Sequence, residues 1–202
     1  MFPQSFFQDT FYLQRILKFA GYDCGNIDGI RGAKTNKAVE NWLLDCDKYR
    51  KQYGTLDERT EKNLESLIPC VQKSVRKWYA EKVKAWQETH SVTVKIICGT
   101  RTIQEQNDLY AQGRTKSGSK VTNAKGGSSF HNFGIAFDIG IFQGKQYLTD
   151  DDLYKDLIAE CGCPDEMLNG GEWSSFKDYP HFEVAKYGSK SANVRKVWNK
   201  LQ

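Results

Sequence analysis

One short segment constrains the fold of this chain more than any other. It runs from Ser129 to Gly140 and reads SFHNFGIAFDIG. After Gly134, large apolar residues alternate with Ala136 and Asp138, which is the period-two pattern of a strand with one buried face. His131 and Asp138 would point to opposite faces of an unbroken strand, because they are an odd number of residues apart. The segment therefore predicts a turn at Gly134 followed by a strand.

A second cluster of polar residues lies at 177–183, where the sequence reads KDYPHFE. Pro180 excludes a regular helix across it, so we expect a turn to bring Asp178 and His181 together. The two clusters hold two of the three histidines of the chain, each close in sequence to an aspartate. Together they supply two imidazoles and two carboxylates.

These four side chains have the composition of a catalytic metal site. Two neutral imidazoles and one carboxylate leave Zn²⁺ with a net charge of about +1 and with an open position for water. The spare carboxylate can take a proton from that water, provided that it does not occupy the metal. We predict that His131, Asp138 and His181 bind zinc and that Asp178 is the general base.

The same residues carry a family resemblance. SFHNFGIAFD resembles the S-x-H-x-x-G-x-A-x-D signature of the LAS-type zinc peptidases, which include D-alanyl-D-alanine peptidases and phage L-alanyl-D-glutamate endolysins, and DYPH resembles their second motif, acid-x-x-H. The resemblance implies the same three zinc ligands and the same base. It also implies an α+β catalytic domain with a central antiparallel sheet. Asp178 stands where many relatives have glutamate, so its shorter side chain must approach the water more closely.

Two further residues receive roles from the resemblance. The segment 99–115, GTRTIQEQNDLYAQGRT, is similar to the family segment in which an arginine lies over the reacting carbonyl. Arg101 would then bind substrate and stabilise the oxyanion, whereas its residue type alone also allows a structural ion pair. Ser129 matches the motif serine and would donate a hydrogen bond to substrate or to a ligand, with a turn role as the alternative. Gln106 and Trp173 are expected to be packing or rim residues.

The N-terminal part resembles a different module. Residues 13–43 match the three-helix peptidoglycan-binding pattern L-Q-x-x-L, then G-Y, then I-D-G-x-x-G-x-x-T-x-x-A-V. We therefore expect a small helical wall-binding module at 1–70 and a zinc peptidase domain at 71–202. Turn and cap residues between its helices are expected at Asp28, Gly29, Gly32 and Thr35.

Periodicity and capping residues predict the remaining elements. Helices are expected at 11–20, after a Thr35 cap, after an Asp57 cap, at 71–88, after a Thr102–Glu105 capping box, at 151–160 and at 191–201. Val92–Cys98 is rich in β-branched residues and predicts a strand. The segment 113–128 is rich in Gly, Ser, Lys and Thr, which predicts an exposed, mobile loop that serves as a lid or a substrate rim.

Composition limits where the protein acts. The chain has 202 residues, a net charge of +4 and six scattered cysteines, which we expect to be free thiols. The tail after Val184 carries only basic charges and suits an anionic polymer, while the chain shows no nucleic-acid motif. It also shows no apolar run of about 18 residues that would span a bilayer, and its first residues lack the pattern of a secretion signal. We expect the protein to be a monomer that accumulates in the host cytoplasm and acts on the cell wall.

The sequence thus predicts a phage-type endolysin that hydrolyses the L-alanyl-D-glutamate bond of peptidoglycan and lyses the host cell. The nearest alternative is a D,D- or L,D-carboxypeptidase of the same group. A 2-His-1-carboxylate iron oxygenase is disfavoured, because its first histidine and its acid are usually almost adjacent. A wall-binding protein with structural zinc is disfavoured as well, because such sites use four protein ligands.

Overall fold

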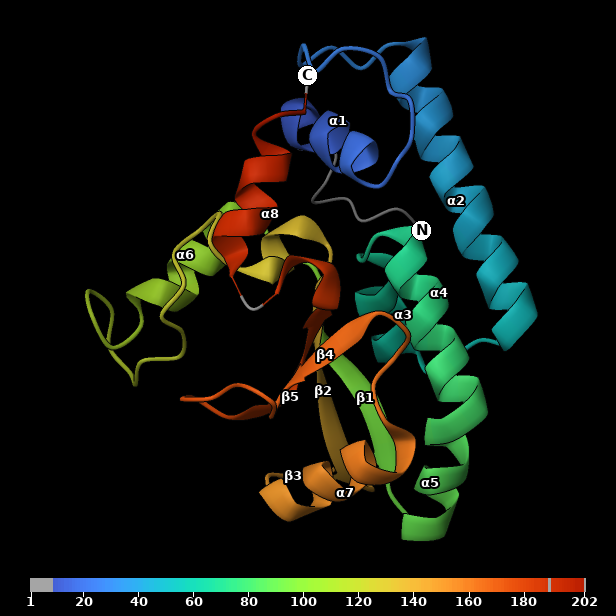
Figure 1. Cartoon of the computed structure of the whole chain (residues 1–202), viewed down its shortest axis with the longest axis vertical. Helices are drawn as coiled ribbons and strands as arrows, with labels where there is room; N and C mark the ends of the chain where they lie inside the picture. The colour runs from blue at the N-terminus through green and yellow to red at the C-terminus, as the bar shows by residue number, and fades with distance from the viewer. Residues whose placement is uncertain (1–8, 189, 202) are drawn as a thin grey trace.

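The computed structural model describes residues 9–188 and 190–201 (Figure 1). The described part leaves out residues 1–8 of the predicted N-terminal module and residues 189 and 202 of the predicted catalytic domain. The elements in chain order are α1 Thr10–Phe19, α2 Ala33–Tyr53, α3 Glu58–Glu65, α4 Pro69–Trp78, the π-helical η2 Tyr79–Val83, α5 Lys84–His90, β1 Thr93–Cys98, α6 Ile103–Ala111, the 3-10 helix η3 Phe130–Phe133, β2 Ala136–Gln143, β3 Gln146–Leu148, α7 Asp151–Cys161, β4 Met167–Gly170, β5 Asp178–Val184, the 3-10 helix η4 Ala185–Tyr187 and α8 Ser191–Trp198.

An antiparallel sheet forms the centre of the molecule. Its strand order is β1-β2-β5-β4, and β3 pairs with β2. The central strand β2 follows the predicted turn, and its apolar side chains Phe137, Ile139 and Ile141 are fully buried. The predicted α+β fold with an antiparallel sheet is confirmed, and so are the strand at β1 and the capping box of α6.

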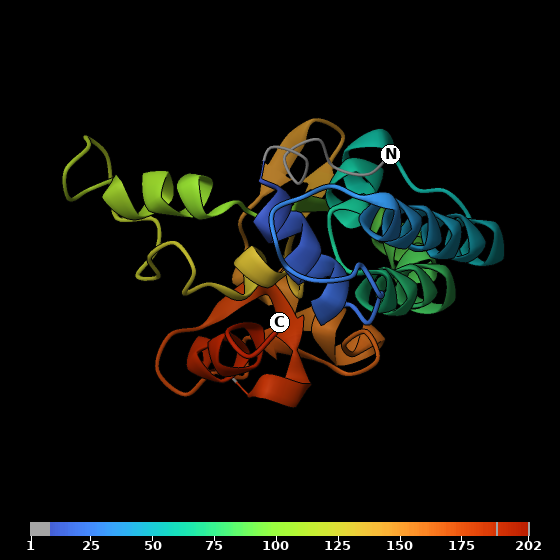
Figure 2. The same cartoon turned by 90° about the horizontal axis from the view of Figure 1, so that it is seen from above.

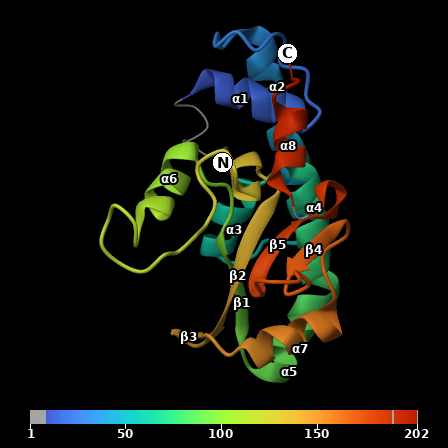
Figure 3. The same cartoon turned by 60° about the vertical axis from the view of Figure 1, so that its left-hand side comes forward.

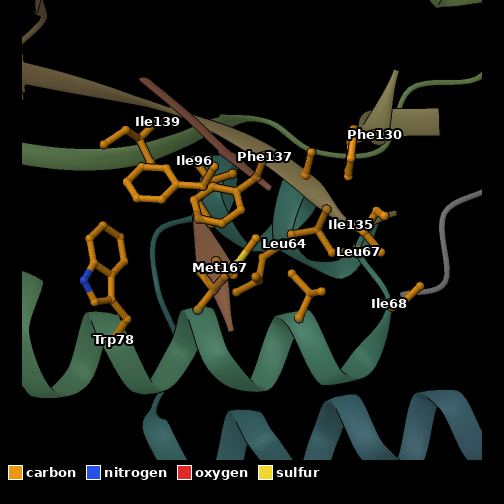
Figure 4. Packing of buried hydrophobic residues seen from close by; sticks show 14 of the residues in the cluster. Leu64, Leu67, Ile68, Trp78, Ile96, Phe130, Ile135, Phe137, Ile139 and Met167 are labelled. Carbon is orange, nitrogen blue, oxygen red and sulfur yellow. The ribbon is translucent and has the colours of Figure 1, made fainter. Parts of the chain in front are cut away.

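The long helix predicted at 71–88 is observed as the continuous run α4, η2 and α5. This run packs against the sheet (Figure 4). Trp78 from the run, Leu64 from α3 and Met167 from β4 point into the same apolar layer as Phe137. The indole of Trp78 lies 5.4 Å from the ring of Phe182 and donates a hydrogen bond to the carbonyl of Cys161, 3.1 Å away. Burying each such side chain contributes roughly 1.5–3 kcal/mol, so this layer fixes the sheet that carries the site.

The helices α1, α2 and α3 lie within residues 1–70, the range predicted as the N-terminal unit. Asp57 caps α3 as predicted, and Gly21 follows the end of α1 with a φ of +92°. The predicted Thr35 cap of α2 was wrong. That helix begins earlier, with Gly32 as its N-cap, and the hydroxyl of Thr35 is buried and donates to the carbonyl of Cys24, 3.1 Å away.

The loop between α1 and α2 is held by one buried side chain. The amide nitrogen of Gln14 donates to Asp28 Oδ1 at 2.8 Å, and its oxygen accepts from the backbone N–H groups of Asp28 and Gly29. Gly29 has a φ of +74°, and a Cβ there would lie 2.5 Å from the ring of Phe11. The positive φ favours glycine at this turn, while the exposed Phe11 ring could move away from a Cβ.

The N-terminal unit packs directly onto the remainder of the chain. Helices α1 and α8 lie side by side (Figures 1 and 3), and the ring of Trp198 lies 5.6 Å from that of Phe19 and 5.2 Å from that of Phe133. The hydroxyl of Tyr12 donates to the carbonyl of Asn132, 2.8 Å away. Buried residues before and after position 70 belong to one apolar cluster. The division of the chain at residue 70 stays a prediction.

The predicted loop at 113–128 projects with α6 from one side of the molecule (Figure 2). Its regular pairing is a single bridge between Gln112 and Lys116, and most of its residues are exposed. The loop is nevertheless fastened to α6, because Gln106 donates to the carbonyl of Ala124 at 2.9 Å and Arg114 donates to that of Tyr110 at 2.7 Å.

None of the helices in the described ranges combines the length and the apolar character that crossing a membrane requires.

Candidate metal centre

Three side chains predicted as ligands meet at one point. His131 Nε2 lies 3.2 Å from Asp138 Oδ1 and 3.3 Å from His181 Nδ1, and His181 Nδ1 lies 2.9 Å from Asp138 Oδ1. Both histidines are buried, and Asp138 is partly exposed. The structure therefore brings together two segments that are separated by about fifty residues of chain.

Local structure aims each side chain at this point. Asp138 in β2 is the direct pairing partner of His181 in β5, so their side chains lie on one face of the sheet. His131 lies in η3, which Ser129 caps and which ends at Gly134 in the left-handed conformation. This is the turn that the sequence predicted. In the structure Ser129 has the cap role, and its contact with substrate or a ligand stays a prediction.

The orientation of His131 leaves its inward nitrogen with a lone pair when the ring is neutral. Its Nδ1 lies 2.7 Å from the carbonyl of Gly99, which only accepts hydrogen bonds, so the proton of the neutral ring belongs on Nδ1. Nε2 then directs a lone pair at a carboxylate oxygen and at a second imidazole nitrogen. Such a cluster of lone pairs is suited to hold a cation at its centre.

The electrostatics of the residues lead to the same conclusion. Burial disfavours a charged imidazole, but the Asp138 carboxylate outweighs it and raises the pKa of His131 to about 10. Burial is likewise overcome at Asp138, because the two histidines hold its pKa well below the usual range. The pKa of His181 is raised against its burial by the same carboxylate. The centre thus favours positive charge, whether as protons or as a metal ion.

The distances also fit zinc. Zinc–nitrogen bonds of about 2.0–2.1 Å in tetrahedral geometry place two ligand atoms roughly 3.3 Å apart, and the three inward atoms are 2.9 to 3.3 Å apart. Cys98 is also close enough to His131 and Asp138 to share a metal ion, but its Sγ lies 3.9 Å from Nδ1 of His131, the nitrogen that faces away from Asp138 and His181. We therefore take the two histidines and Asp138 as the set that fits a metal.

Asp178 opens β5, three residues before His181. A regular strand would place these two side chains on opposite faces. The pairing is irregular here, however, since Asn169 pairs with Phe182 while the next residue, Gly170, pairs with Asp178. The prediction of a turn around Pro180 was therefore wrong. Asp178 and His181 belong to one strand, and its register shift against β4 takes the place of the predicted turn.

The Asp178 carboxyl is half-buried, and its surroundings suit a base. Burial raises its pKa, and the nearby His181 opposes that rise. The charges of Asp138, His131 and Arg101 act on it as well. A raised pKa makes a carboxylate a better proton acceptor. Its role as the base stays a prediction.

Arg101 lies on the outer side of the cluster. Its guanidinium donates to Asp138 Oδ2 at 2.8 Å, to Gln106 Oε1 at 3.0 Å and to Cys98 Sγ at 3.1 Å. The ion pair that residue type allowed is thus present. Gln106, expected as a packing or rim residue, is buried and connects Arg101 to the 113–128 loop.

The sequence predicted no role for Glu183, and for Trp173 it predicted a packing or rim position. Glu183 Oε2 lies 3.3 Å from His181 Nε2, and its position two residues along the same strand was the available signal. The ring of Trp173 lies 5.1 Å from that of His181. Beside it is a cavity of about 550 Å³ that the β4–β5 loop and the start of α8 line, with Phe176, Tyr187 and Lys190 among its walls.

Comparisons with known proteins agree with this geometry. A family model described as D-alanyl-D-alanine carboxypeptidase matches residues 122–184, the range that holds both histidines and both aspartates but not Arg101. The peptidoglycan L-alanyl-D-glutamate endopeptidase CwlK of Bacillus subtilis (strain 168) is 35% identical over 129 residues, which cover 58% of this chain and 75% of that protein.

A solved structure, the L-Ala D-Glu endopeptidase ChiX of Serratia marcescens, aligns with 22% identity and a TM-score of 0.43 over 64% of this chain and 88% of that one. The identity to CwlK over three quarters of its length is sufficient to show common family membership. On that basis, and with both signature motifs inside the matched range, this chain belongs to the LAS-type peptidases, a family of metallopeptidases.

Proposed function

We propose that this protein is a zinc-dependent peptidoglycan endopeptidase that hydrolyses the L-alanyl-D-glutamate bond of the stem peptide. The observation that carries the proposal is the cluster of His131, Asp138 and His181, whose inward atoms lie within 3.3 Å of one another. The activity printed for CwlK supports the choice of bond. The half-buried Asp178 supports hydrolysis over a purely structural zinc site.

Zinc bound by these three residues supplies a Lewis acid that acidifies water and polarises the scissile carbonyl. Asp178 accepts the proton that the attacking water loses as its oxygen bonds to the carbonyl carbon. The same carboxyl then donates this proton to the amine of D-glutamate as the C–N bond breaks. Arg101, at the edge of the cluster, stabilises the negative charge that develops on the carbonyl oxygen.

The test of the base is the variant Asp178→Ala, with Asp152→Ala on the exposed face of α7 as a matched control. Because Asp178 does not hold the metal, we expect the variant to bind one zinc per chain while turnover on purified peptidoglycan falls by about 10²–10⁴-fold. His131→Ala is expected to lose both zinc and turnover. Normal turnover in a zinc-loaded Asp178→Ala protein would remove Asp178 as the base.

The bond that is cut is decided by mass spectrometry of muropeptide digests. Release of whole peptides that begin with D-glutamate is expected. Release of single D-alanine residues would instead favour the D,D- or L,D-carboxypeptidase, the activity that the matching family description names.

The biological role that we propose is that of a phage endolysin. The protein would collect in the host cytoplasm as a monomer and reach the wall through membrane lesions. The basic residues of α8, Arg195 and Lys196, favour an anionic polymer such as the wall. In an expression host we expect lysis only after the membrane is permeabilised, and lysis of intact cells would contradict the role.

The N-terminal unit is proposed to bind peptidoglycan and so raise the local concentration of the enzyme. An exposed apolar pair supports this, since Phe11 and Ile30 flank the Gly29 turn and are 53% and 69% exposed. In a pelleting assay with insoluble peptidoglycan, the inactive Asp178→Ala protein should sediment, and adding Ile30→Ser should reduce the bound fraction. Equal sedimentation of both proteins would argue against this face.

A further inference from the structure

Glu183 is an acidic side chain buried behind the candidate metal centre. It is 2% exposed, and its Oε2 lies 3.3 Å from Nε2 of His181, the nitrogen that faces away from the other ligands. Its Oε1 is buried as well and has no hydrogen-bond partner among the described residues. Within the described part of the chain its ion-pair partner is His181.

We propose that Glu183 is a positioning residue that fixes the tautomer and the ring orientation of His181 for metal binding. The inference rests on the proposed metal centre. A carboxylate only accepts hydrogen bonds, so Oε2 keeps the ring proton of His181 on Nε2. The lone pair of Nδ1 is then left free and points at Asp138 Oδ1, 2.9 Å away.

The two histidines are held by different partners. His131 donates through Nδ1 to the neutral carbonyl of Gly99, at 2.7 Å. His181 donates through Nε2 to a carboxylate, which makes the imidazole a stronger electron donor to a metal than a carbonyl does. Glu183 therefore sets both the direction and the basicity of one ligand.

Packing alone does not account for a glutamate at this position. Removing a carboxylate from water is unfavourable, and an apolar side chain of similar size would fill the space without that penalty. The strand faces of β2 and β4 on either side contribute Ala136 and Leu168 as its pairing partners, neither of which offsets a charge. His181 is the partner that stabilises it, and a metal ion bound by that ring would add to this stabilisation.

The experiment measures the zinc dissociation constant by competition with a chromogenic chelator, on the full chain. The variants are Glu183→Gln, which keeps the size and one acceptor but removes the charge, and Glu183→Leu, which removes both. Glu172→Gln, an exposed position on the β4–β5 loop, is the matched control. We expect zinc affinity about 10–100-fold weaker in both Glu183 variants and unchanged in the control.

A second readout separates positioning from a general structural role. In the cobalt-substituted protein the visible absorption bands report ligand geometry, and we expect them to shift in Glu183→Gln. A cooperative thermal unfolding transition of the metal-free Glu183→Gln protein shows that the variant folds, so that a loss of zinc affinity cannot be assigned to a loss of the fold. If Glu183→Leu fails to fold, the zinc affinity and the cobalt spectrum of Glu183→Gln alone test the proposal.

Wild-type zinc affinity together with an unchanged cobalt spectrum in Glu183→Gln would overturn this inference while leaving the proposed function standing. Failure of the wild-type protein to bind zinc would overturn the metal centre, and this inference with it.

Discussion

Arg101 binds one oxygen of the Asp138 carboxylate and leaves the other oxygen to face the two histidines. Asp138 Oδ2 accepts from the guanidinium of Arg101 at 2.8 Å, while Oδ1 of the same group faces His131 and His181. The ion pair thereby holds one oxygen outward and turns the other inward. Arg101 is thus tied to a ligand, and its positive charge is placed at the edge of the centre.

This arrangement predicts two separable effects of Arg101→Met. Losing the hold on Asp138 should weaken zinc binding, and losing an oxyanion donor should lower kcat by about 10²–10³-fold. Turnover measured at saturating zinc, with metal content verified, isolates the second effect. Full recovery of turnover in excess zinc would show that Arg101 only positions Asp138.

Gln106 is predicted to couple the 113–128 loop to the centre. Its side chain is fully buried, accepts from Arg101 and donates to the carbonyl of Ala124. Gln106→Leu leaves both groups without that partner, which should cost roughly 1–3 kcal/mol of unfolding free energy. Limited proteolysis should also cut the loop faster. Gln104→Leu, exposed on the same helix, is the control, and equal protease sensitivity of the two variants would contradict the coupling.

The cavity beside Trp173 is predicted to bind part of the substrate. Phe176 on its wall is 66% exposed, so its ring is accessible to a ligand that enters the cavity. Because it contacts no reacting group, Phe176→Ala should raise KM with kcat unchanged, the signature of lost uniform binding. Tyr147→Ala, exposed on β3, serves as the control. An unchanged KM for Phe176→Ala would exclude the cavity from substrate binding.

Features of the fold and the site that depend on residues close in sequence were predictable, and features that depend on contacts between distant segments were not. The turn at Gly134 and the strand after it follow from local pattern, and so the direction of His131 relative to Asp138 was predictable. The position of Asp178 was not, because it depends on the register shift against Gly170, a contact between strands. Thr35 was misjudged as a cap because α2 already begins at Ala33, which places Thr35 inside its first turn. Glu183 was overlooked because its role becomes visible only once His181 has a known orientation.

Acid sensitivity of the fold is predicted to depend on Glu61 in α3. Its carboxylate accepts from the fully buried Arg76 at 2.8 and 2.6 Å. Burial opposes ionisation, but the Arg76 hydrogen bonds prevail and lower the pKa of Glu61 from its ordinary value of 4.5. A lowered folded-state pKa gives stability that is present above the unfolded pKa and is lost as the pH falls through the folded one.

The wild-type protein should therefore lose unfolding free energy as the pH drops below about 4.5. Glu61→Gln leaves the buried Arg76 charge unpaired and should cost about 3–5 kcal/mol at neutral pH. It should also flatten the acid limb, because the variant has no proton to take up at this position. Urea unfolding of both proteins across the acid range checks this, with Glu58→Gln at the exposed start of the same helix as the control. Parallel acid limbs for wild type and Glu61→Gln would assign the acid sensitivity to other groups.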